Sequence, residues 1–402
     1  MVGGGPAGLM AAEVLAGAGV AVVVFERMPS PGRKLLRAGR GGLNLTHSEP
    51  LTDLLDRYGP ARDRLAPAIE AFDPTALRAW CAGLGLDTMV GSSGRVFPIG
   101  LRAAPLLRAW LRRLEALGVE LRPGHRWEGW TSQGALLVTD PAGTTSAVEA
   151  DAVVLALGGA SWSRLGSDGA WVEPIAAAGI AVAPLRPANC GFVVPWSATF
   201  RDRFAGVPLK DVVLSHAGTS ARGDAVVTAK GLEGGAVYAM SRPLREALEA
   251  GRPATLQIDL RPDQTIAELA ARLSRRRPKD SRATALRRGA HLHPVDIGLL
   301  REVTGNRLPE DPQDVARLIK AIGVTPTATQ PLDRAISTAG GIALDEVDDA
   351  FMLRRRPGTF VAGEMLDWEA PTGGYLLQAT ISSAVAAANG ALSWIKGTGA
   401  GG

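Results

Sequence analysis

The sequence predicts an α/β protein whose main domain is Rossmann-like, is formed by both ends of the chain, and is interrupted by an inserted β-rich domain carrying a helical subdomain. Three observations support this prediction. A glycine loop and a helix open the chain in "MVGGGPAGLMAAE", the pattern changes near residue 186 to short strand-like runs, and the end returns to a strand, a glycine loop and an Ala-rich helix. We therefore expect the Rossmann-like domain at 1–185 and 331–402 and the inserted domain at 186–330.

The glycine loop has the spacing of a phosphate-binding turn. Gly3, Gly5 and Gly8 fit G-x-G-x-x-G, which lets the backbone approach a pyrophosphate and opens a helix whose amide end attracts an anion. The apolar run "VAVVVFER" then ends in Glu26, about 20 residues after the loop, where an acidic side chain accepts from a ribose hydroxyl. The alternative is a simple tight turn with Glu26 as a solvated charge.

The first strand of such a domain is nearly missing from the sequence. Only Met1 and Val2 precede Gly3, whereas about five apolar residues of a central strand are usual before the loop. We therefore expect the natural protein to begin several residues upstream. An intact mass of the native protein that matched Met1 or Val2 as the first residue would exclude this.

Composition narrows the class of protein. The 402 residues are 46% hydrophobic and 21% charged, which is ordinary for a globular chain, and the formal net charge of +4 favours anionic ligands while being too small to imply nucleic acid. Cys81 and Cys190 lie far apart, so we expect neither a disulfide framework nor a cysteine metal site. His291 and His293 lack a ligand cluster, so no metal is expected. Without a leader or an apolar run of about 18 residues, we expect a cytoplasmic protein with no membrane partner.

Three further segments carry candidate ligand contacts. The stretch "RMPSPGRKLLRAGRGGLNLTHSE" mixes glycines with Arg33 and Lys34, as suits a segment lying against a phosphorylated cofactor, although a solvated basic loop is the alternative. The paired Gly158 and Gly159 follow a strand-like run, "SAVEADAVVLALGG", where a ligand commonly lies, or they form a turn. In the loop "GSSGRVFP", between mainly helical segments of 50–125, Arg95 is either a substrate-facing cation or an exposed arginine.

The inserted domain contains an Arg-rich run, "TIAELAARLSRRRPKDSRATALRRGAHLHP". Such a run could be an RNA-binding face. Because it lacks interleaved aromatics and includes Asp and Glu, the interpretation as a solvated helix is favoured and a nucleic-acid partner is not expected.

Long stretches of the chain resemble the BaiN-like FAD-dependent oxidoreductases, a family that includes 3-dehydro-bile-acid reductases and aminoacetone oxidases. The resemblance rests on "GGGPAGLMAAE", "GRKLLRAGRGGLNLTH", "NCGFVV", "STAGGIALDEVD" and "FVAGEMLDWEAPTGGYLLQATISS". This chain has "GRGGLN" where better-known members carry a "GGGRCN" type segment, so it belongs to a distinct branch and their substrates do not carry over.

The resemblance implies FAD as the cofactor and gives roles to particular residues. The glycine loop would cradle the pyrophosphate, Glu26 would hold the adenosine ribose, Asp367 would bond the ribityl chain, and the last helix would point its N-terminus at the flavin pyrimidine edge. The candidate cofactor-binding residues are Gly3, Gly5, Pro6, Ala7, Gly8, Glu26, Arg33, Lys34, Gly158, Gly159, Gly363, Glu364, Asp367, Gly373, Gly374 and Tyr375.

For the substrate half, the residue types favour polarising a carbonyl and moving a proton. The candidate catalytic residues are Arg40, Asn44, His47, Arg95 and Tyr375. The leading hypothesis is an enzyme that reduces an activated C=C or C=O bond of a small hydrophobic molecule with NAD(P)H. NAD(P)H would visit transiently, because the chain has one dinucleotide fingerprint. The alternatives are an amine or alcohol oxidase using oxygen, an RNA-associated flavoprotein, and a flavin sensor without turnover; the oligomeric state is open.

Overall fold

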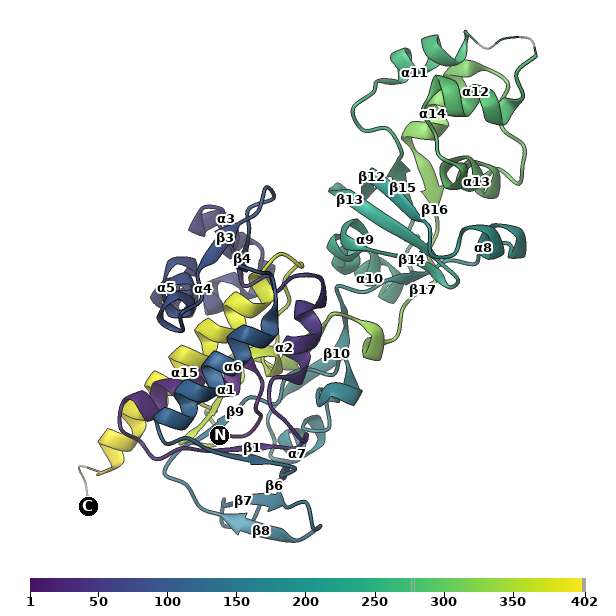
Figure 1. The fold of residues 1–402 in the computed structure, drawn as a ribbon. Coiled ribbons are helices and arrows are strands. Elements are labelled where there is room, and N and C mark those ends of the chain that lie inside the picture. Colours follow the sequence, from purple (N-terminus) through teal and green to yellow (C-terminus); the bar gives the residue numbers. More distant parts are fainter. Residues whose placement is uncertain (276, 278, 400–402) are drawn as a thin grey trace. The chain divides into compact units, whose positions relative to one another are not determined.

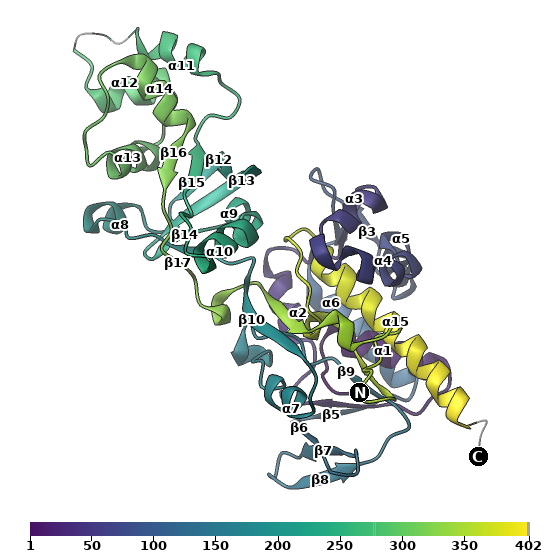
Figure 2. The ribbon, with the colours of Figure 1, turned by 180° about the vertical axis from the view of Figure 1, so that it is seen from behind.

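The chain folds as two units, which can be followed by their sequence colours in Figures 1 and 2. The computed structural model describes residues 1–275, 277 and 279–399. Unit 1 comprises Met1–Arg186 and the chain from Ser337 onward, and unit 2 comprises Pro187–Ile336. The chain leaves unit 1 along β10 (Val182–Ala188) and returns in β18 (Ser337–Ile342), and these two strands pair.

Unit 1 is built around a parallel sheet. Strand β1 (Val23–Glu26) pairs with β5 (Glu120–Pro123), and β9 (Val153–Leu155) pairs with β19 (Thr359–Val361). Val2 forms one parallel bridge to Phe25 and another to Leu155, so it joins the two pairs at the central position of the sheet. Glu26 is the last residue of β1, and the carboxyl end of β9 leads into the segment that carries the Gly158–Gly159 pair.

Helices α1 (Pro6–Gly17), α6 (Ala103–Ala116) and α15 (Tyr375–Gly399) pack beside this sheet, with α1 running along α15 (Figure 1). The contact is close because small residues meet there. Ala11 and Ala12 of α1, and Ala384 and Ala388 of α15, are fully buried. Because alanine side chains are small, the backbones of the two helices can approach closely. The N-termini of both helices thus belong to the same packed unit.

The remaining elements of unit 1 are short. Its helices are α2 (Arg33–Ala38), α3 (Leu51–Asp56), α4 (Arg62–Ala71), α5 (Pro74–Gly83), α7 (Val172–Ala177) and the 3-10 turns η1 (Gly39–Gly41), η2 (Gly59–Ala61), η3 (Ser163–Leu165), η5 (Leu344–Glu346) and η6 (Gly363–Met365). Two antiparallel sheets complete it: β2 (Thr46–His47), β4 (Arg95–Pro98) and β3 (Thr88–Val90) in the order β2–β4–β3, and β6 (Arg126–Trp130), β7 (Leu136–Thr139) and β8 (Thr145–Val148).

Two local expectations from the sequence are wrong. Arg95 does not lie in a loop between helices but begins β4, because the alternating burial of Val96 and Pro98 suits a strand paired on both sides. The run at 146–159 is not one strand. It divides into β8 and β9 because the exposed polar residues around Asp151 separate the pairing segments.

Unit 2 has a mixed architecture of its own. Its sheet has the order β16–β15–β12–β13–β14–β11–β17 with antiparallel pairing. Unit 2 has a hydrophobic core of its own, separate from that of unit 1. The strands are β11 (Phe192–Val193), β12 (Pro208–His216), β13 (Thr219–Thr228), β14 (Gly231–Glu233), β15 (Leu256–Asp259), β16 (Ile322–Val324) and β17 (Ala328–Thr329). The helices are α8 (Ala198–Phe204), α9 (Gly235–Ala239), α10 (Ser241–Glu249), α11 (Ile266–Leu273), α12 (Arg282–Gly289), α13 (Pro294–Val303), α14 (Pro312–Lys320) and the turn η4 (Leu332–Arg334).

The helical part of unit 2, α11–α14, lies between β15 and β16 in the sequence. Its helices begin at recognisable caps, such as the reciprocal hydrogen bonds between Thr265 and Glu268 at α11. Within the described ranges, no helix combines the length and the apolarity needed to cross a bilayer.

Candidate functional site

The glycine loop is shaped by contacts between backbone atoms. Gly3 has φ +102°, and a Cβ on it would collide with the carbonyl of Ala156; a Cβ on Gly8 would collide with the carbonyl of Gly3. A Cβ on Gly5 would meet nothing within 4 Å. The first turn of α1, from Pro6, has neither an acidic residue nor a side-chain cap. The loop therefore leaves open space in front of uncapped amides, which is how a helix N-terminus receives a phosphate group.

Glu26 is held beside this loop by backbone donors. Its Oε2 accepts from the Gly4 N–H at 2.7 Å, and its Oε1 accepts from the Met28 N–H at 2.7 Å. The Gly4 carbonyl accepts from the Gly32 N–H at 2.8 Å, which ties the following loop to the same place. A carboxylate fixed in this way keeps lone pairs for a further hydroxyl donor.

Lys34, Glu364 and Gly159 meet although they are far apart in sequence. Lys34 Nζ lies 2.6 Å from Glu364 Oε2 and 2.8 Å from Ser161 Oγ, and Glu364 Oε1 accepts from the Thr338 N–H at 2.9 Å. The Gly159 N–H is 3.4 Å from Glu364 Oε2. These contacts fix the loops after β9 and β19 relative to α2. Arg33, next to Lys34, keeps its Nε buried and without a partner in the described structure.

The loop after Gly158 folds back toward the end of β1. Gly158 has φ +72°, and its carbonyl accepts from Trp171 Nε1 at 2.8 Å, while Arg27 pairs with Asp168 at 2.5 Å. Ser167 is 5% exposed, yet its Oγ has no partner in the described part of the chain. A buried hydroxyl without a partner is costly unless a ligand or water completes it. Sequence reasoning missed Ser167, although "GSDG" soon after the glycine pair was an available signal.

The N-terminus of α15 is anchored against β2. Gly374 has φ +103°, and a Cβ on it would collide with the backbone of Thr46. Thr46 Oγ1 donates to Gln378 Oε1 at 2.7 Å, and the Tyr58 hydroxyl donates to the Tyr375 carbonyl at 2.9 Å, both in buried surroundings. The first turn of α15 carries no acidic residue. This helix start, like that of α1, therefore has no acidic residue of its own in the first turn.

Tyr375, the first residue of α15, lies in a polar cluster. Its ring stacks on His47 with centroids 5.4 Å apart, and the Arg57 guanidinium lies 5.8 Å from its centroid. Arg57 also forms a two-point contact with Glu49, at 2.6 and 3.2 Å. Burial, followed by hydrogen bonding to Glu49, raises the pKa of Tyr375 above its usual range. Burial opposes the change at Glu49, but hydrogen bonds from Arg57 and Tyr375 hold its pKa below its usual value. The phenol therefore stays protonated well above neutral pH.

His47 has defined partners on both ring nitrogens. Nε2 lies 2.9 Å from the Ser93 carbonyl, and Nδ1 lies 3.2 Å from the Glu49 N–H. Since a carbonyl only accepts, Nε2 donates and Nδ1 accepts. His47 is also the register partner of Arg95 across β2 and β4. The structure thus brings together three of the predicted catalytic residues: His47, Arg95 and Tyr375.

The other predicted residues are placed as follows. Asn44 Oδ1 is buried and has no partner in the described part of the chain. Arg40 falls within η1, and its side chain lies outside what the structure describes. Burial raises the pKa of Asp367, opposed by Arg186. Gly363 has φ +74°, and a Cβ on it would come 3.0 Å from Ala7 Cβ, so the loop after β19 reaches the start of α1.

Sequence reasoning missed the side chains that surround Tyr375. Glu49, Arg57 and Tyr58 belong to no motif, and only the closeness of Glu49 to His47 in the sequence hinted at a role.

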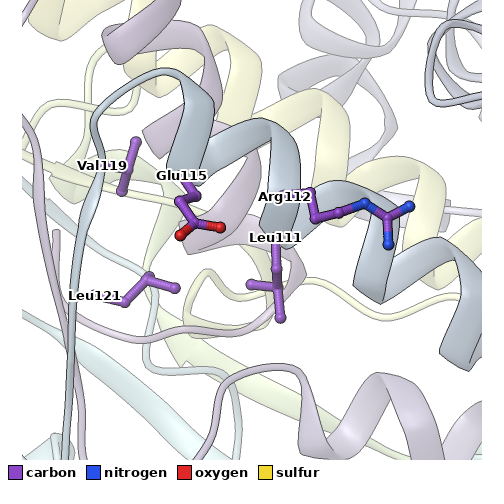
Figure 3. A pocket seen from close by; sticks show the side chains of 5 residues that line it. All are labelled: Leu111, Arg112, Glu115, Val119 and Leu121. Carbon is purple, nitrogen blue, oxygen red and sulfur yellow. The ribbon is translucent and has the colours of Figure 1, made fainter.

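Unit 1 also has a hollow that contains none of the candidate site residues. It lies at the C-terminal end of α6 and is lined by Leu111, Arg112, Glu115, Val119 and Leu121, none of which was a candidate (Figure 3). Among the described residues, no three His, Cys, Asp or Glu side chains form a potential metal site.

The mixed α/β fold of unit 1 and the uncapped start of α1 are those expected of a Rossmann-type flavoprotein oxidoreductase. The chain belongs to the HI0933-like family, because the family described as "HI0933-like protein Rossmann domain" matches residues 1–390. This confirms the family and the FAD-dependent oxidoreductase class predicted from the sequence.

Among the curated proteins that are similar to this chain, two match it over nearly its whole length. A protein of Clostridium scindens named 3-dehydro-bile acid delta(4,6)-reductase is 26% identical, covering 94% of this chain and 95% of its own. A protein of Haemophilus influenzae named ribosomal RNA dihydrouridine synthase is 24% identical, covering 96% of each.

Several solved structures have a similar fold, and two of them illustrate it. An open conformation of a flavocytochrome c3 fumarate reductase has a TM-score of 0.54 and 14% identity, covering 98% of this chain and 78% of that one. A 3-ketosteroid-delta4-(5alpha)-dehydrogenase of Rhodococcus jostii RHA1 has a TM-score of 0.51 and 17% identity, covering 98% of this chain and 95% of that one. At these identities the likeness concerns the fold, which is the mixed α/β fold of FAD-binding Rossmann-like proteins.

Proposed function

We propose that this protein uses NAD(P)H to reduce a C=C bond conjugated to a carbonyl in a small apolar molecule. The observation that carries the proposal is the Tyr375 cluster. It combines a phenol that keeps its proton, an imidazole with a defined donor nitrogen and an arginine on the neighbouring strand. These are the groups needed to polarise a carbonyl and to supply a proton.

The names of the two curated relatives support the same bond type. One names a reductase of Δ4,6 double bonds, and the other names the formation of dihydrouridine, which is uridine with one ring C=C bond reduced. Both bonds are conjugated to carbonyl groups, so reduction of a conjugated C=C bond is their shared chemistry.

The residues of unit 1 fit FAD. The open space at Gly5 and the uncapped start of α1 would hold the pyrophosphate, and the anchored carboxylate of Glu26 would accept from a ribose hydroxyl. The unpartnered Oδ1 of Asn44 and Oγ of Ser167 are sites that a polar cofactor would satisfy. When bound, FAD would supply the hydride chemistry.

The chain's own groups would divide the remaining work. The amides at the start of α15 would stabilise negative charge, a contribution of about 0.3–2 kcal/mol for a helix terminus. Arg95 would hold the carbonyl of the substrate, while Tyr375 or His47 would hold the proton that the reduced carbon skeleton takes up. The Arg57–Glu49 pair would fix the ring of Tyr375 in place.

A visible spectrum during anaerobic addition of NADPH or NADH tests the proposal. We expect the flavin bands to bleach and then to return on adding an α,β-unsaturated ketone without oxygen. Bleaching by amines or alcohols, with return on admitting oxygen, would establish the oxidase alternative instead. Persistence of the bands with every donor would favour the sensor.

Two variants, one in the cluster and one in unit 2, test the role of the Tyr375 cluster in catalysis. We expect Tyr375→Phe to lower kcat by about 100-fold, the lower end of the range for general acid catalysis, while the protein still binds FAD. His216→Gln is the control, because His216 lies on β12 of unit 2 and its Nδ1 contacts the Thr255 carbonyl at 2.8 Å. Equal rates for Tyr375→Phe and the unchanged protein would remove Tyr375 from the mechanism.

A second candidate function is reduction of a uracil base in ribosomal RNA. The name of the Haemophilus relative favours it, together with the exposed Arg275, Arg277, Lys279 and Arg287 around α12. Binding of ribosomal RNA that weakens steeply with salt, and loss of uridine on incubation with NADPH, would support this candidate over the small-molecule one.

A further inference from the structure

Large apolar side chains remain exposed next to the strands that carry His47 and Arg95. Met89 is 43% exposed, Leu101 is 43% exposed, and Ile99 is 64% exposed. They lie on β3 or in the segment that follows β4. Single exposed apolar residues are common on protein surfaces and need no explanation. A contiguous group of them, in contrast, is typical of a binding surface.

The strand register shows which of these side chains share a face. His47 is opposite Arg95, and Met89 is opposite Phe97. Directly opposite residues of antiparallel strands point to the same side, and residues two apart on one strand do as well. His47, Arg95, Phe97 and Met89 therefore line one face of the β2–β4–β3 sheet.

The other face of this sheet belongs to the core. Val96, between Arg95 and Phe97, is fully buried and is opposite Thr46, whose hydroxyl contacts α15. Val90 is opposite Val96, so it points to this second side although it is 45% exposed. Met89 and Val90 are thus neighbours of similar exposure that point in opposite directions.

Glycines border the first face and leave room beside its aromatic ring. A Cβ on Gly42 would lie 3.4 Å from Phe97 Cε1 and 3.8 Å from Leu101 Cβ, and a Cβ on Gly91 would lie 3.4 Å from Phe97 Cε2. The Leu43 N–H donates to the Leu101 carbonyl at 2.8 Å, which holds this border in place. Apolar surface therefore continues from Phe97 to Leu101, beginning at the His47–Arg95 pair.

We propose that this face, defined by His47, Arg95, Phe97 and Met89 with Leu101 at its border, binds the apolar body of the substrate while Arg95 takes its carbonyl oxygen. The inference rests on the proposed function and specifies the substrate as a neutral enone with an extended hydrocarbon body. Arg95 makes no ion pair within the described part of the chain, so its charge is available to a ligand oxygen. Among the described side chains that define the face, Arg95 is the permanent cation and Phe97, Met89 and Leu101 are apolar. This combination fits such a substrate better than a polyphosphate backbone, which needs several cations.

The test uses the FAD-loaded protein with two homologous series: 4-alkylcyclohex-2-enones as substrates and the saturated 4-alkylcyclohexanones as ligands that cannot be reduced. We expect kcat/KM to rise, and the Kd of the saturated ketones to fall, about two- to fourfold for each added CH2. Binding is followed by calorimetry, so this readout does not depend on turnover.

Two adjacent variants make the test specific. Met89→Gln is expected to flatten the dependence on alkyl length, while Val90→Gln, of similar exposure on the opposite side, leaves it unchanged. Arg95→Gln is expected to weaken binding of every ketone about tenfold without altering the dependence on length.

The outcomes separate this inference from the proposed function. Length-dependent binding of ketones with no turnover of enones would uphold the face and reject the reductase. Turnover that ignores alkyl length, or equal effects of Met89→Gln and Val90→Gln, would uphold the reductase and overturn the face. Displacement of the ketones by ribosomal RNA, lost in Met89→Gln, would assign the face to RNA and overturn the inference as well.

Discussion

The starts of α1 and α15 look alike in sequence but are constructed differently. Each follows consecutive glycines, and neither has an acidic residue in its first turn. At α1 the shape comes from contacts between backbone atoms, with Gly3 and Gly8 closely packed. At α15 the shape comes mainly from side chains of distant segments, among them Tyr58, Thr46 and Gln378.

This difference in construction suits the two helix starts to different kinds of ligand. A site made of backbone is nearly the same whatever the surrounding side chains are, which suits a constant ligand part such as a pyrophosphate. A site made of side chains can change by substitution, which suits a variable partner such as a substrate. This explains why the first helix start is recognisable as a motif while the surroundings of the second are not.

The largest expected loss of stability comes from a substitution in the glycine loop before α1. We expect Gly8→Ala to destabilise the protein by about 3 kcal/mol or to prevent folding, because its Cβ would collide with the Gly3 carbonyl, a rigid neighbour. Gly5→Ala is the matched control for stability, since its Cβ meets nothing within 4 Å. It should change the unfolding free energy of the FAD-free protein by no more than about 1 kcal/mol.

The same pair also tests ligand placement. Gly5→Ala should weaken FAD binding at least tenfold, measured by fluorescence titration, because the methyl group enters the space in front of the α1 amides. Unchanged FAD affinity in Gly5→Ala would show that the cofactor does not use this loop.

A smaller effect is expected where one side-chain contact is removed. Tyr58→Phe deletes the buried hydrogen bond to the Tyr375 carbonyl and should lower the unfolding free energy by about 1 kcal/mol. Urea unfolding measures this, with Tyr238→Phe in unit 2 as the control for losing a phenol elsewhere. Unchanged stability and unchanged FAD affinity in Tyr58→Phe would show that this hydrogen bond does not stabilise the start of α15.

The smallest effect concerns alkaline pH. Burial, followed by the neighbouring Tyr375 and Glu49, raises the pKa of Tyr58, and burial with Glu49 raises the pKa of Tyr375. Unfolded tyrosines release protons from about pH 10, whereas these two keep theirs in the folded state, so stability is full below that pH and falls above it. Urea unfolding between pH 9 and pH 11 should show this decline, and a shallower one in Tyr58→Phe. Identical slopes would contradict the pKa assignment.

Parts of the candidate site that lie close together in the sequence were easier to predict than parts that lie far apart. The glycine loop and Glu26 lie within one strand–helix–strand segment, so spacing alone identifies them. Lys34 and Glu364 are 330 residues apart, and no pattern in a single sequence pairs them. The family resemblance gave both residues a place near the cofactor, but it did not predict that they contact each other.

The β2–β4–β3 sheet was missed for a different reason. Its strands are two to four residues long, too short for alternation to distinguish them from loops between helices. Arg95 was therefore given the wrong local structure, and its role stays a prediction. The mixed α/β flavoprotein fold is confirmed by the comparisons, while the roles of individual residues stay predictions.

The long-range pairing of Lys34 with Glu364, Thr46 with Gln378 and Tyr58 with Tyr375 has a consequence for biosynthesis. The partners are separated by 330, 332 and 317 residues. At about 5–20 residues per second, the ribosome needs on the order of tens of seconds between making the first member of each pair and the second. The nascent chain thus carries the glycine loop long before the opposite wall of the candidate site exists. On the proposed roles, FAD would be bound late in maturation, and a prematurely stopped chain lacking α15 would be left without half of the candidate site.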